Sequence, residues 1–537
     1  MVLSKAHKQT FLQGALILAV ANVIVKIIGA GFKIPLARLI GEDGGGLFNT
    51  AYTMYTWMFV IATAGLPVAV SKMVSESIAR NNRYEAHRIF HVAFYLLSFI
   101  GMIGTAVLFF GARFFADILS NSRAAVAIMA VSPALLFVAI MSAYRGYFQG
   151  MQNMIPTAVS EVIEALGKLI IGYILASIWL HRGVEYSAAG AVLGVSAGAF
   201  LGAAGLYFIY QVYHGKMMEE VRFSKERSVK VKPAGRILKE LVKIAIPITI
   251  GASVFSLTNV IDLALVMNRL SSIGLGEVEV SSLYGSYSMY AVPLFNLPPT
   301  LISSLSISIV PVIASALAVH NTKLAKATTE SALRITMLFA LPCAVGLSVL
   351  SEPILQFVYD NANATTLLQI LGIAVVFVSM VMVSNAILQA SGKVMIPVRN
   401  MFIGGAAKVI SNYILVGIPQ INIHGAPIGT NLCYIIIITL NLLEVKKVTG
   451  AEYKFTDFFV KPLIAVGSMA VSVLFGYNKF IEIWQSNSLA TIGAIVVGAV
   501  IYTLMLFAVR AVKKEDIEML PKGKGMVKAL NRMKLLK

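Results

Sequence analysis

Long apolar runs alternate with short polar segments along almost all of this 537-residue chain. In helical form, about 20 consecutive apolar residues cross the hydrocarbon core of a bilayer. Runs of that length predict about fourteen membrane-spanning helices, six before a long polar gap and eight after it. The predicted spans are 11–40, 47–71, 86–110, 124–147, 156–180, 187–213, 241–267, 283–316, 331–350, 366–391, 396–418, 425–445, 456–475 and 489–512.

Composition indicates lipid as the solvent of this chain. Hydrophobic residues make up 58% of it and charged residues 13%, whereas a soluble domain carries roughly 25% charged residues. The two cysteines, Cys343 and Cys433, lie in apolar stretches without metal-ligand spacing, so we expect neither a disulfide framework nor a metal site. The expected fold class is therefore an all-α polytopic membrane protein.

The formal net charge of +19 fits a topology signal better than a nucleic-acid surface. Basic residues gather at the two ends of the chain and in every second connection, including the gap after the sixth span. Because such loops face the cytoplasm, we expect both termini to be cytoplasmic. The first apolar run contains lysines and no cleavage site follows it, so we expect it to be retained.

Weak internal duplication relates the two halves of the chain. The matches join Asn22-Val23-Ile24 to Asn259-Val260-Ile261, Tyr52-Thr53-Met54-Tyr55 to Tyr287-Ser288-Met289-Tyr290, and Gln149, Lys168 and Tyr173 to Gln389, Lys408 and Tyr413, at offsets of 237, 235 and 240 residues. Six spans separate the copies, which predicts two pseudo-symmetric six-helix lobes with parallel repeats, followed by two extra helices. We expect an N-terminal lobe at 1–213, a basic cytoplasmic linker at 214–240, a C-terminal lobe at 241–446, and the last two helices with a basic tail at 447–537.

Charged groups inside the first span are the strongest functional signal, because an ionisable group in lipid is costly. Asn22, Lys26 and Lys33 share one helical face, and Lys26 lies near the middle of the span. A cationic stripe facing a cavity would suit an anionic substrate, although hydrogen bonding within the helix bundle is an alternative. Arg38 lies near the outer end, where a long side chain can reach the interface.

The fifth and seventh spans carry further charges. Glu161, Glu164 and Lys168 share a face, and a local Glu164–Lys168 pair is the plainest interpretation. Lys408, the repeat partner of Lys168, has no acidic residue four positions earlier. Asp262 shares a face with Asn259 and either balances the lysines of the first span or binds a proton or cation during a transport cycle.

Polar and proline residues mark the eighth span. Tyr287 and Tyr290 precede Pro298-Pro299, which interrupts backbone hydrogen bonding, either as a moving bend or as a static kink. The run Gly44-Gly45-Gly46 lacks the Gly-Lys-Ser/Thr ending of a phosphate loop. We therefore expect no cofactor, and a driving force from Na⁺, H⁺ or the membrane potential.

With these residues in view, the chain resembles the MurJ and SpoVB type of polysaccharide-biosynthesis protein, within the multidrug/oligosaccharidyl-lipid/polysaccharide flippase superfamily. The resemblance covers nearly the whole chain. It rests on the segments Lys26-Ile27-Ile28-Gly29, Pro35-Leu36-Ala37-Arg38-Leu39-Ile40-Gly41, Ala64-Gly65-Leu66-Pro67-Val68-Ala69-Val70-Ser71-Lys72 and Arg145-Gly146-Tyr147-Phe148-Gln149-Gly150.

The resemblance implies a flippase for a polyprenyl-pyrophosphate-linked sugar, typically the peptidoglycan precursor lipid II. Such proteins form two lobes in a V around a basic cavity and work by alternating access. The MurJ type carries arginine where Lys26 stands here, and often an Arg-Asp pair in place of Phe32-Lys33, so the site stays basic but differs in detail. For such a substrate, we expect the sugar to contact the tyrosines of the second and eighth spans, Tyr52 and Tyr287 among them. The expected partners are the lipid-linked oligosaccharide and membrane lipids, and protein partners stay open.

Three alternatives remain. A drug or organic-cation antiporter on the same scaffold would need acidic cavity residues, whereas the central charges of the first span are basic. An exporter of another lipid-linked glycan cannot be separated from a lipid II flippase by sequence. A membrane enzyme would need a cluster of carboxylates or histidines at an interface, and the seven histidines are scattered.

Overall fold

The computed structural model describes residues 11–226, 232–453, 456–513 and 516, and the regular elements in this part of the chain are all helices. Ten helical stretches among the described residues are long and apolar enough to cross a membrane. The first of them, Ile17–Ala79, has 63 residues, which is long enough for two crossings. The all-α polytopic membrane fold is therefore confirmed, and the number of fourteen crossings stays a prediction.

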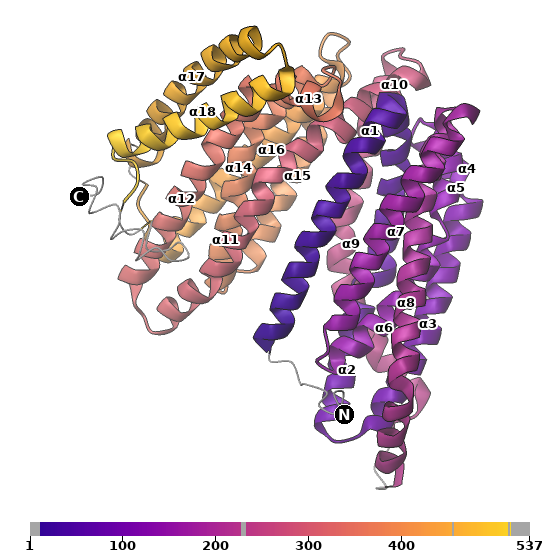
Figure 1. The fold of residues 1–537 in the computed structure, drawn as a ribbon. Coiled ribbons are helices and arrows are strands. Elements are labelled where there is room, and N and C mark those ends of the chain that lie inside the picture. Colours follow the sequence, from indigo (N-terminus) through magenta and orange to yellow (C-terminus); the bar gives the residue numbers. More distant parts are fainter. Residues whose placement is uncertain (1–10, 227–231, 454–455, 514–515, 517–537) are drawn as a thin grey trace. The chain divides into compact units, whose positions relative to one another are not determined.

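The chain folds into two compact units, Met1–Gly285 and Ser286–Lys537 (Figure 1). Helices α9 and α10 belong to the first unit, and the lobe boundaries at 213 and 241 stay a prediction. The helices of the first unit are α1 (Phe11–Thr63), α2 (Leu66–Ala79), α3 (Arg83–Phe110), α4 (Ala112–Ile118), η1 (Ser122–Ala124), α5 (Ala125–Val131), α6 (Ala134–Gly150), α7 (Ile155–Trp179), η2 (Leu180–Arg182), α8 (Val184–Glu226), α9 (Ala234–Ser272) and α10 (Glu277–Gly285).

A single glycine divides α1 into two helical segments. Gly41 has φ 67° and ψ −166°, a conformation that side-chain-bearing residues rarely adopt. The break falls directly after the predicted first span, 11–40, and separates it from the second. The helix α8 continues past its predicted end at 213 to Glu226, so helix occupies part of the segment 214–240 that we predicted as a linker.

Small residues let α7 and α8 approach closely. A Cβ atom on Gly198 would clash with the backbone carbonyl of Glu164, and one on Gly194 would clash with the backbone of Gly172. Close backbone approach through small residues is the usual basis of helix association in lipid. This contact fixes the rotation of α7 and with it the direction of its charged face, which includes Glu161 and Lys168.

The second unit contains the remaining helices. They are η3 (Ser286–Ala291), α11 (Val292–Ala318), α12 (Thr322–Val349), α13 (Ser351–Tyr359), α14 (Thr365–Ala390), α15 (Met395–Leu415), η4 (Asn422–His424), α16 (Gly425–Thr449), η5 (Thr456–Val460), α17 (Lys461–Trp484) and α18 (Asn487–Ala508). The helix α11 runs through Pro298 and Pro299, and the wider π-helical turn η3 precedes it.

Buried amides connect three helices of the second unit. Asn400 of α15 donates to the side-chain oxygen of Asn441 on α16 at 2.8 Å. Asn441 in turn donates to Ser384 and Asn385 of α14 at 2.9 and 2.7 Å. Asn400 and Asn441 are fully buried, so these side chains satisfy one another where water is excluded.

The last two helices form a pair on the outside of the second unit. The helices α17 and α18 pack against each other, α17 against α12, and α18 against α13 (Figure 1). Two side-chain hydrogen bonds tie α18 down: Tyr502 donates to the carbonyl of Leu338, and Asn487 donates to the carbonyl of Pro353. The pair is thus anchored by polar contacts as well as by apolar packing.

Candidate functional site

A partly open cavity lies within the first unit, between α1, α7 and α8. Its volume is about 250 Å³, close to the lower end of ligand pockets, roughly 300 Å³. Aromatic rings and three charged side chains line it, which suits a ligand that is both polar and ring-bearing. The lining residues are Val25, Gly29, Phe32, Tyr52, Tyr55, Thr56, Phe59, Glu161, Glu164, Ala165, Lys168 and Val195.

Lys168 is the cation of this cavity. Its ammonium nitrogen lies 4.4 Å from the centre of the Tyr52 ring and 5.3 Å from that of Phe32. Both distances are within the range of cation–π attraction. Lys168 forms no ion pair with a described carboxylate. The aromatic faces therefore hold the lysine in place while its positive charge stays unneutralised.

The acidic residue next to Lys168 on the same face has another partner. Arg145 of α6 lies 2.9 Å from Glu164, and its Nε donates to Ser160 at 2.9 Å. The expected local pair of Glu164 with Lys168 is therefore wrong, because the arginine from the neighbouring helix satisfies Glu164 instead. Sequence reasoning did not assign Arg145 to the site, although an arginine inside an apolar helix was a signal that could have found it.

Glu161 lies one turn before Glu164 on the cavity wall. Its Oε2 atom is buried, and the side chain has neither a hydrogen-bond nor an ion-pair partner among the described residues. A buried carboxylate without a partner is unusual, since the charged form loses its hydration. The cavity thus contains one unneutralised lysine and one unpartnered carboxyl group.

The residues predicted on the first span lie at different depths. Lys33 is half-buried and lies within electrostatic range of Lys168 and Tyr52. Asn22, Lys26 and Arg38 are exposed, and none of the three lines the cavity. The structure therefore brings Lys33 close to Lys168, and the substrate role of the residues on the first span stays a prediction.

The other predicted residues are not part of the lining of this cavity. Asn259 is exposed and Asp262 half-buried on α9 of the first unit. In the second unit, Lys408 is half-buried on α15, and the buried Tyr287 lies 3.4 Å from the hydroxyl of Thr430. The roles that the sequence suggested for these four side chains also stay predictions.

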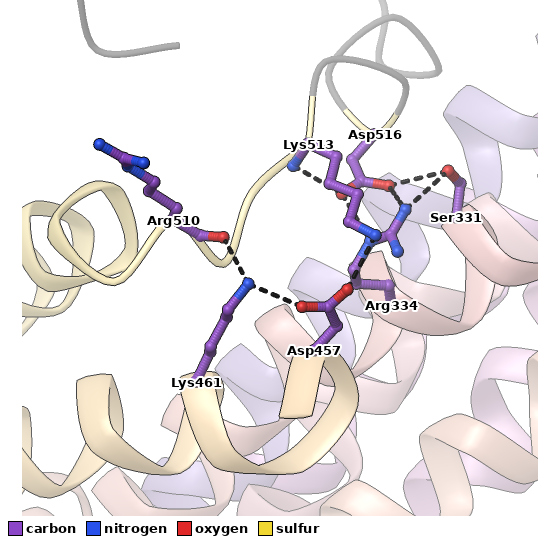
Figure 2. Close-up of polar contacts among 7 residues, drawn as sticks. All are labelled: Ser331, Arg334, Asp457, Lys461, Arg510, Lys513 and Asp516. Atoms are coloured by element: carbon purple, nitrogen blue, oxygen red, sulfur yellow. Dashed lines mark hydrogen bonds and ion pairs between the residues drawn. The ribbon is translucent and has the colours of Figure 1, made fainter. Parts of the chain in front are cut away.

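A second cluster of charges lies in the second unit, and there each carboxylate has a cationic partner (Figure 2). The guanidinium of Arg334 on α12 binds both oxygens of Asp516 at 2.7 Å, and Ser331 donates to the same carboxylate at 2.8 Å. The carboxylate of Asp457 accepts from Lys461 at 2.7 Å and lies 2.9 Å from the ammonium of Lys513. Figure 2 shows Asp457 between two lysines and Asp516 held by Arg334 and Ser331, which is the arrangement of a structural lock.

Comparison with known proteins places the chain in a family. A family model described as polysaccharide biosynthesis protein matches residues 11–317, and one described as MatE matches residues 247–414. The chain is 27% identical to stage V sporulation protein B of Bacillus subtilis (strain 168), over 520 residues that cover 96% of this chain and 98% of that protein. It is also 27% identical to lipid II flippase MurJ of the same organism, over 516 residues covering 91% and 93%.

Solved structures show the same fold. A multidrug resistance MATE family transporter of the MOP superfamily, in an inward-facing conformation, superposes with a TM-score of 0.62 at 15% identity, covering 81% of this chain and 100% of that one. Lipid II flippase MurJ in an inward closed conformation gives a TM-score of 0.56 at 15% identity, covering 86% and 96%. The chain therefore belongs to the polysaccharide biosynthesis protein family and has the fold of the MOP-superfamily transporters.

Proposed function

We propose that this protein is a flippase for a polyprenyl-pyrophosphate-linked sugar, with lipid II as the first substrate to test. It would work by alternating access in a bacterial plasma membrane, with both termini cytoplasmic. One observation carries the proposal: the cavity of the first unit contains an unneutralised cation, Lys168, held between two aromatic rings. The relatives with an assigned transport activity are a flippase and transporters rather than enzymes, which supports transport without chemical conversion.

The chemistry of the cavity fits the two parts of such a headgroup. A pyrophosphate concentrates negative charge, and an ammonium group in a partly desolvated cavity attracts it more strongly than in water. Lys33 lies near enough to Lys168 to add to that positive potential. The faces of Tyr52, Tyr55 and Phe59 line the same cavity and offer stacking surfaces for sugar rings.

Only the headgroup needs a polar path through the membrane. The polyprenyl chain is itself apolar and can stay in the hydrocarbon region, so the protein has to lower the cost of moving the charges and the sugar. A cavity of about 250 Å³ holds a part of such a headgroup and not the whole lipid. The binding site therefore takes the pyrophosphate and the adjoining sugar.

The direct experiment is headgroup translocation in proteoliposomes. Lipid II, another lipid-linked glycan and an organic cation are compared as cargo with the wild-type protein. Lys33→Ala and Lys26→Ala are then compared with the wild type, with normal insertion verified for each variant. The proposal expects transport of a pyrophosphate-linked glycan and a larger loss with Lys33→Ala, because Lys33 is half-buried near Lys168 whereas Lys26 is exposed.

Two outcomes would change the assignment. If the wild type moves none of the lipid-linked glycans, the substrate class is wrong. If it moves organic cations instead, the protein is a cation exporter, and the carboxyl group of Glu161 becomes the expected contact for its substrate. A diffusion potential or a Na⁺ or pH gradient applied to the same vesicles shows which gradient, if any, drives transport.

A further inference from the structure

Glu161 is the one charged residue of the cavity wall without any partner in the described part of the chain. It lies on α7, one turn before Glu164 and two turns before Lys168, so the three side chains share a face of the helix. The packing of α7 against the glycines of α8 holds that face toward α1. Glu161 therefore belongs to the same cavity as the proposed anion-binding lysine.

The titratable and charged groups in and beside the cavity of Glu161 come from three helices. From α6 comes Arg145, which already serves Glu164. Glu164 and Lys168 of α7 and Tyr52 and Tyr55 of α1 line the same cavity, and α8 contributes only Val195 to the described lining. The positive charge of Arg145 is thus paired with Glu164. Glu161 shares the cavity with Lys168 and with any bound ligand.

An anionic ligand changes the electrostatics around Glu161. A pyrophosphate bound at Lys168 would neutralise the positive charge of the lysine. It would also add negative charge beside the carboxyl group of Glu161, which has no hydrogen-bond donor among the described residues. Desolvation and a like charge both favour the neutral form of a carboxyl group. An ionised Glu161 and a bound pyrophosphate therefore oppose each other, whereas a protonated Glu161 and the anion are compatible.

We propose that the cavity binds its anionic headgroup together with one proton, and that Glu161 carries the proton. The inference rests on the proposed function, since it takes the ligand to be a pyrophosphate. The proton comes from the solvent when the headgroup enters, and it returns to the solvent when the headgroup leaves. The carboxyl group of Glu161 is thus a proton site that sets the affinity of the cavity for the anion.

The direction of the pH dependence follows from linkage between the two ligands. If binding takes up a proton at Glu161, the affinity for the anion falls as the pH rises. Glutamine has the shape of the protonated side chain and cannot ionise, so Glu161→Gln removes this part of the pH dependence. We expect the variant to bind the anion at least fivefold more tightly than the wild type at pH 8, a coupling of ordinary size, about 1 kcal/mol. At pH 5 the ratio approaches one.

The test is calorimetric titration of the protein in nanodiscs with farnesyl diphosphate, a short polyprenyl diphosphate. Repeating the titration in buffers of different ionisation enthalpy gives the number of protons taken up per bound ligand. The titration of the probe's own phosphates is common to all variants and cancels in the comparison between them. Near neutral pH, we expect Glu161→Gln to take up fewer protons per bound ligand than the wild type, by at most one proton.

Two further variants separate this inference from the function on which it rests. Lys168→Gln removes the proposed cation and should abolish binding. Glu482→Gln changes an exposed glutamate of α17 outside the cavity and should bind like the wild type. Should the glutamine variant fail to insert, Glu161→Ala provides a second neutral side chain at the same position.

The possible results are distinct. Equal proton uptake and equal pH dependence in the wild type and in Glu161→Gln, with binding still lost in Lys168→Gln, would overturn the proton site and leave the proposed function standing. Unchanged binding in Lys168→Gln would remove the anion site itself, and the proposed function would lose the observation that carries it. If only the Glu161 variants take up fewer protons per bound ligand than the wild type, the result supports the inference.

Discussion

Side chains at equivalent repeat positions bridge two helices in each unit, and the two bridges differ in charge and in connectivity. At the repeat offset of 240 residues, Arg145 and Ser160 of the first unit correspond to Asn385 and Asn400 of the second. In the first unit the arginine donates directly to the serine. In the second unit, Asn441 connects the two asparagines through hydrogen bonds of 2.7 and 2.8 Å.

The difference shows that charge is not required to hold these helices together. Neutral amides perform the bridging in the second unit, because Asn400 of α15 donates to Asn441 of α16 and Asn441 donates to α14. In the first unit the position of Asn385 is taken by Arg145, which pairs with Glu164. Glu164 lies one turn beyond Ser160, and its counterpart in the second unit is Gly404. These two charges pair with each other beside the cavity, and Glu164 belongs to its lining.

A second contrast concerns how each unit treats a buried cation. Arg334 of the second unit has an exposed side-chain fraction of 6% and binds both oxygens of Asp516. Lys168 of the first unit has aromatic rings in place of a carboxylate. We therefore expect changes at Arg334 to reduce stability and changes at Lys168 to reduce transport.

The largest effect is expected for Asp516→Ala. The change leaves the buried guanidinium of Arg334 without its carboxylate, and breaking a buried pair in this way costs roughly 3–5 kcal/mol. Equilibrium unfolding in mixed detergent micelles measures the loss. Glu482→Ala, which removes an exposed ion pair with Lys479, is the control and should change the stability by less than about 0.5 kcal/mol. Equal effects of the two variants would contradict the lock shown in Figure 2.

A smaller loss of stability is expected for Arg145→Gln. The variant strands the carboxylate of Glu164, whose side chain is about one-quarter exposed (26%), so the cost should be about 2 kcal/mol. The matched change in the second unit is Asn385→Ala, which removes one neutral acceptor and should cost about 1 kcal/mol. The same unfolding assay compares them. A larger loss for the asparagine would mean that the charged bridge is less important for folding than the neutral one.

The amide network predicts a change in stability without a change in transport. Asn441→Leu removes the connection between α14 and α15 and should destabilise the protein by about 1 kcal/mol, the scale of one hydrogen bond between helices in lipid. Unfolding and translocation are measured on the same preparation. Transport that fell at least tenfold in a stably inserted variant would place the second unit's network in the transport site.

The smallest effect is expected at the aromatic face under Lys168. Tyr52→Leu removes the nearer cation–π contact, worth about 0.5–1 kcal/mol, so the affinity for an anionic probe should fall by roughly two- to fivefold. Tyr52→Phe keeps the ring and should bind like the wild type. Equal losses in the two variants would assign the effect to the hydroxyl group rather than to the ring face.

The helices and their order could be predicted from the sequence because the apolar runs are long. The break after residue 40 agrees with the positive φ of Gly41, and the predicted spans lie on described helices. Several of them, including 47–71, 124–147 and 283–316, are each divided among more than one helix. What the sequence left undecided were the ends: α8 extends to Glu226 through a polar segment. Hydropathy marks where lipid begins, and a helix can continue into water past that point.

The candidate site was predicted only in part, for a different reason. Lys168 and Glu161 were selected as charges in a span, yet spacing along one helix suggested that Lys168 pairs with Glu164. The partner of Glu164 comes instead from α6, 19 residues away. Contacts between helices depend on helix rotation, which the glycines of α7 and α8 set, and a pattern along one helix does not contain that information.

The most direct test of the account is translocation of a pyrophosphate-linked glycan by Lys168→Gln and Lys408→Gln, the two members of one repeat pair. Both changes remove a positive charge from equivalent helices, α7 and α15, and only the first lines the cavity of the first unit. We predict at least a tenfold loss of rate for Lys168→Gln, about 1.4 kcal/mol, and a rate within about twofold of the wild type for Lys408→Gln. Equal losses in the two variants, or a normal rate for Lys168→Gln, would contradict the claim that the first unit binds the anionic headgroup.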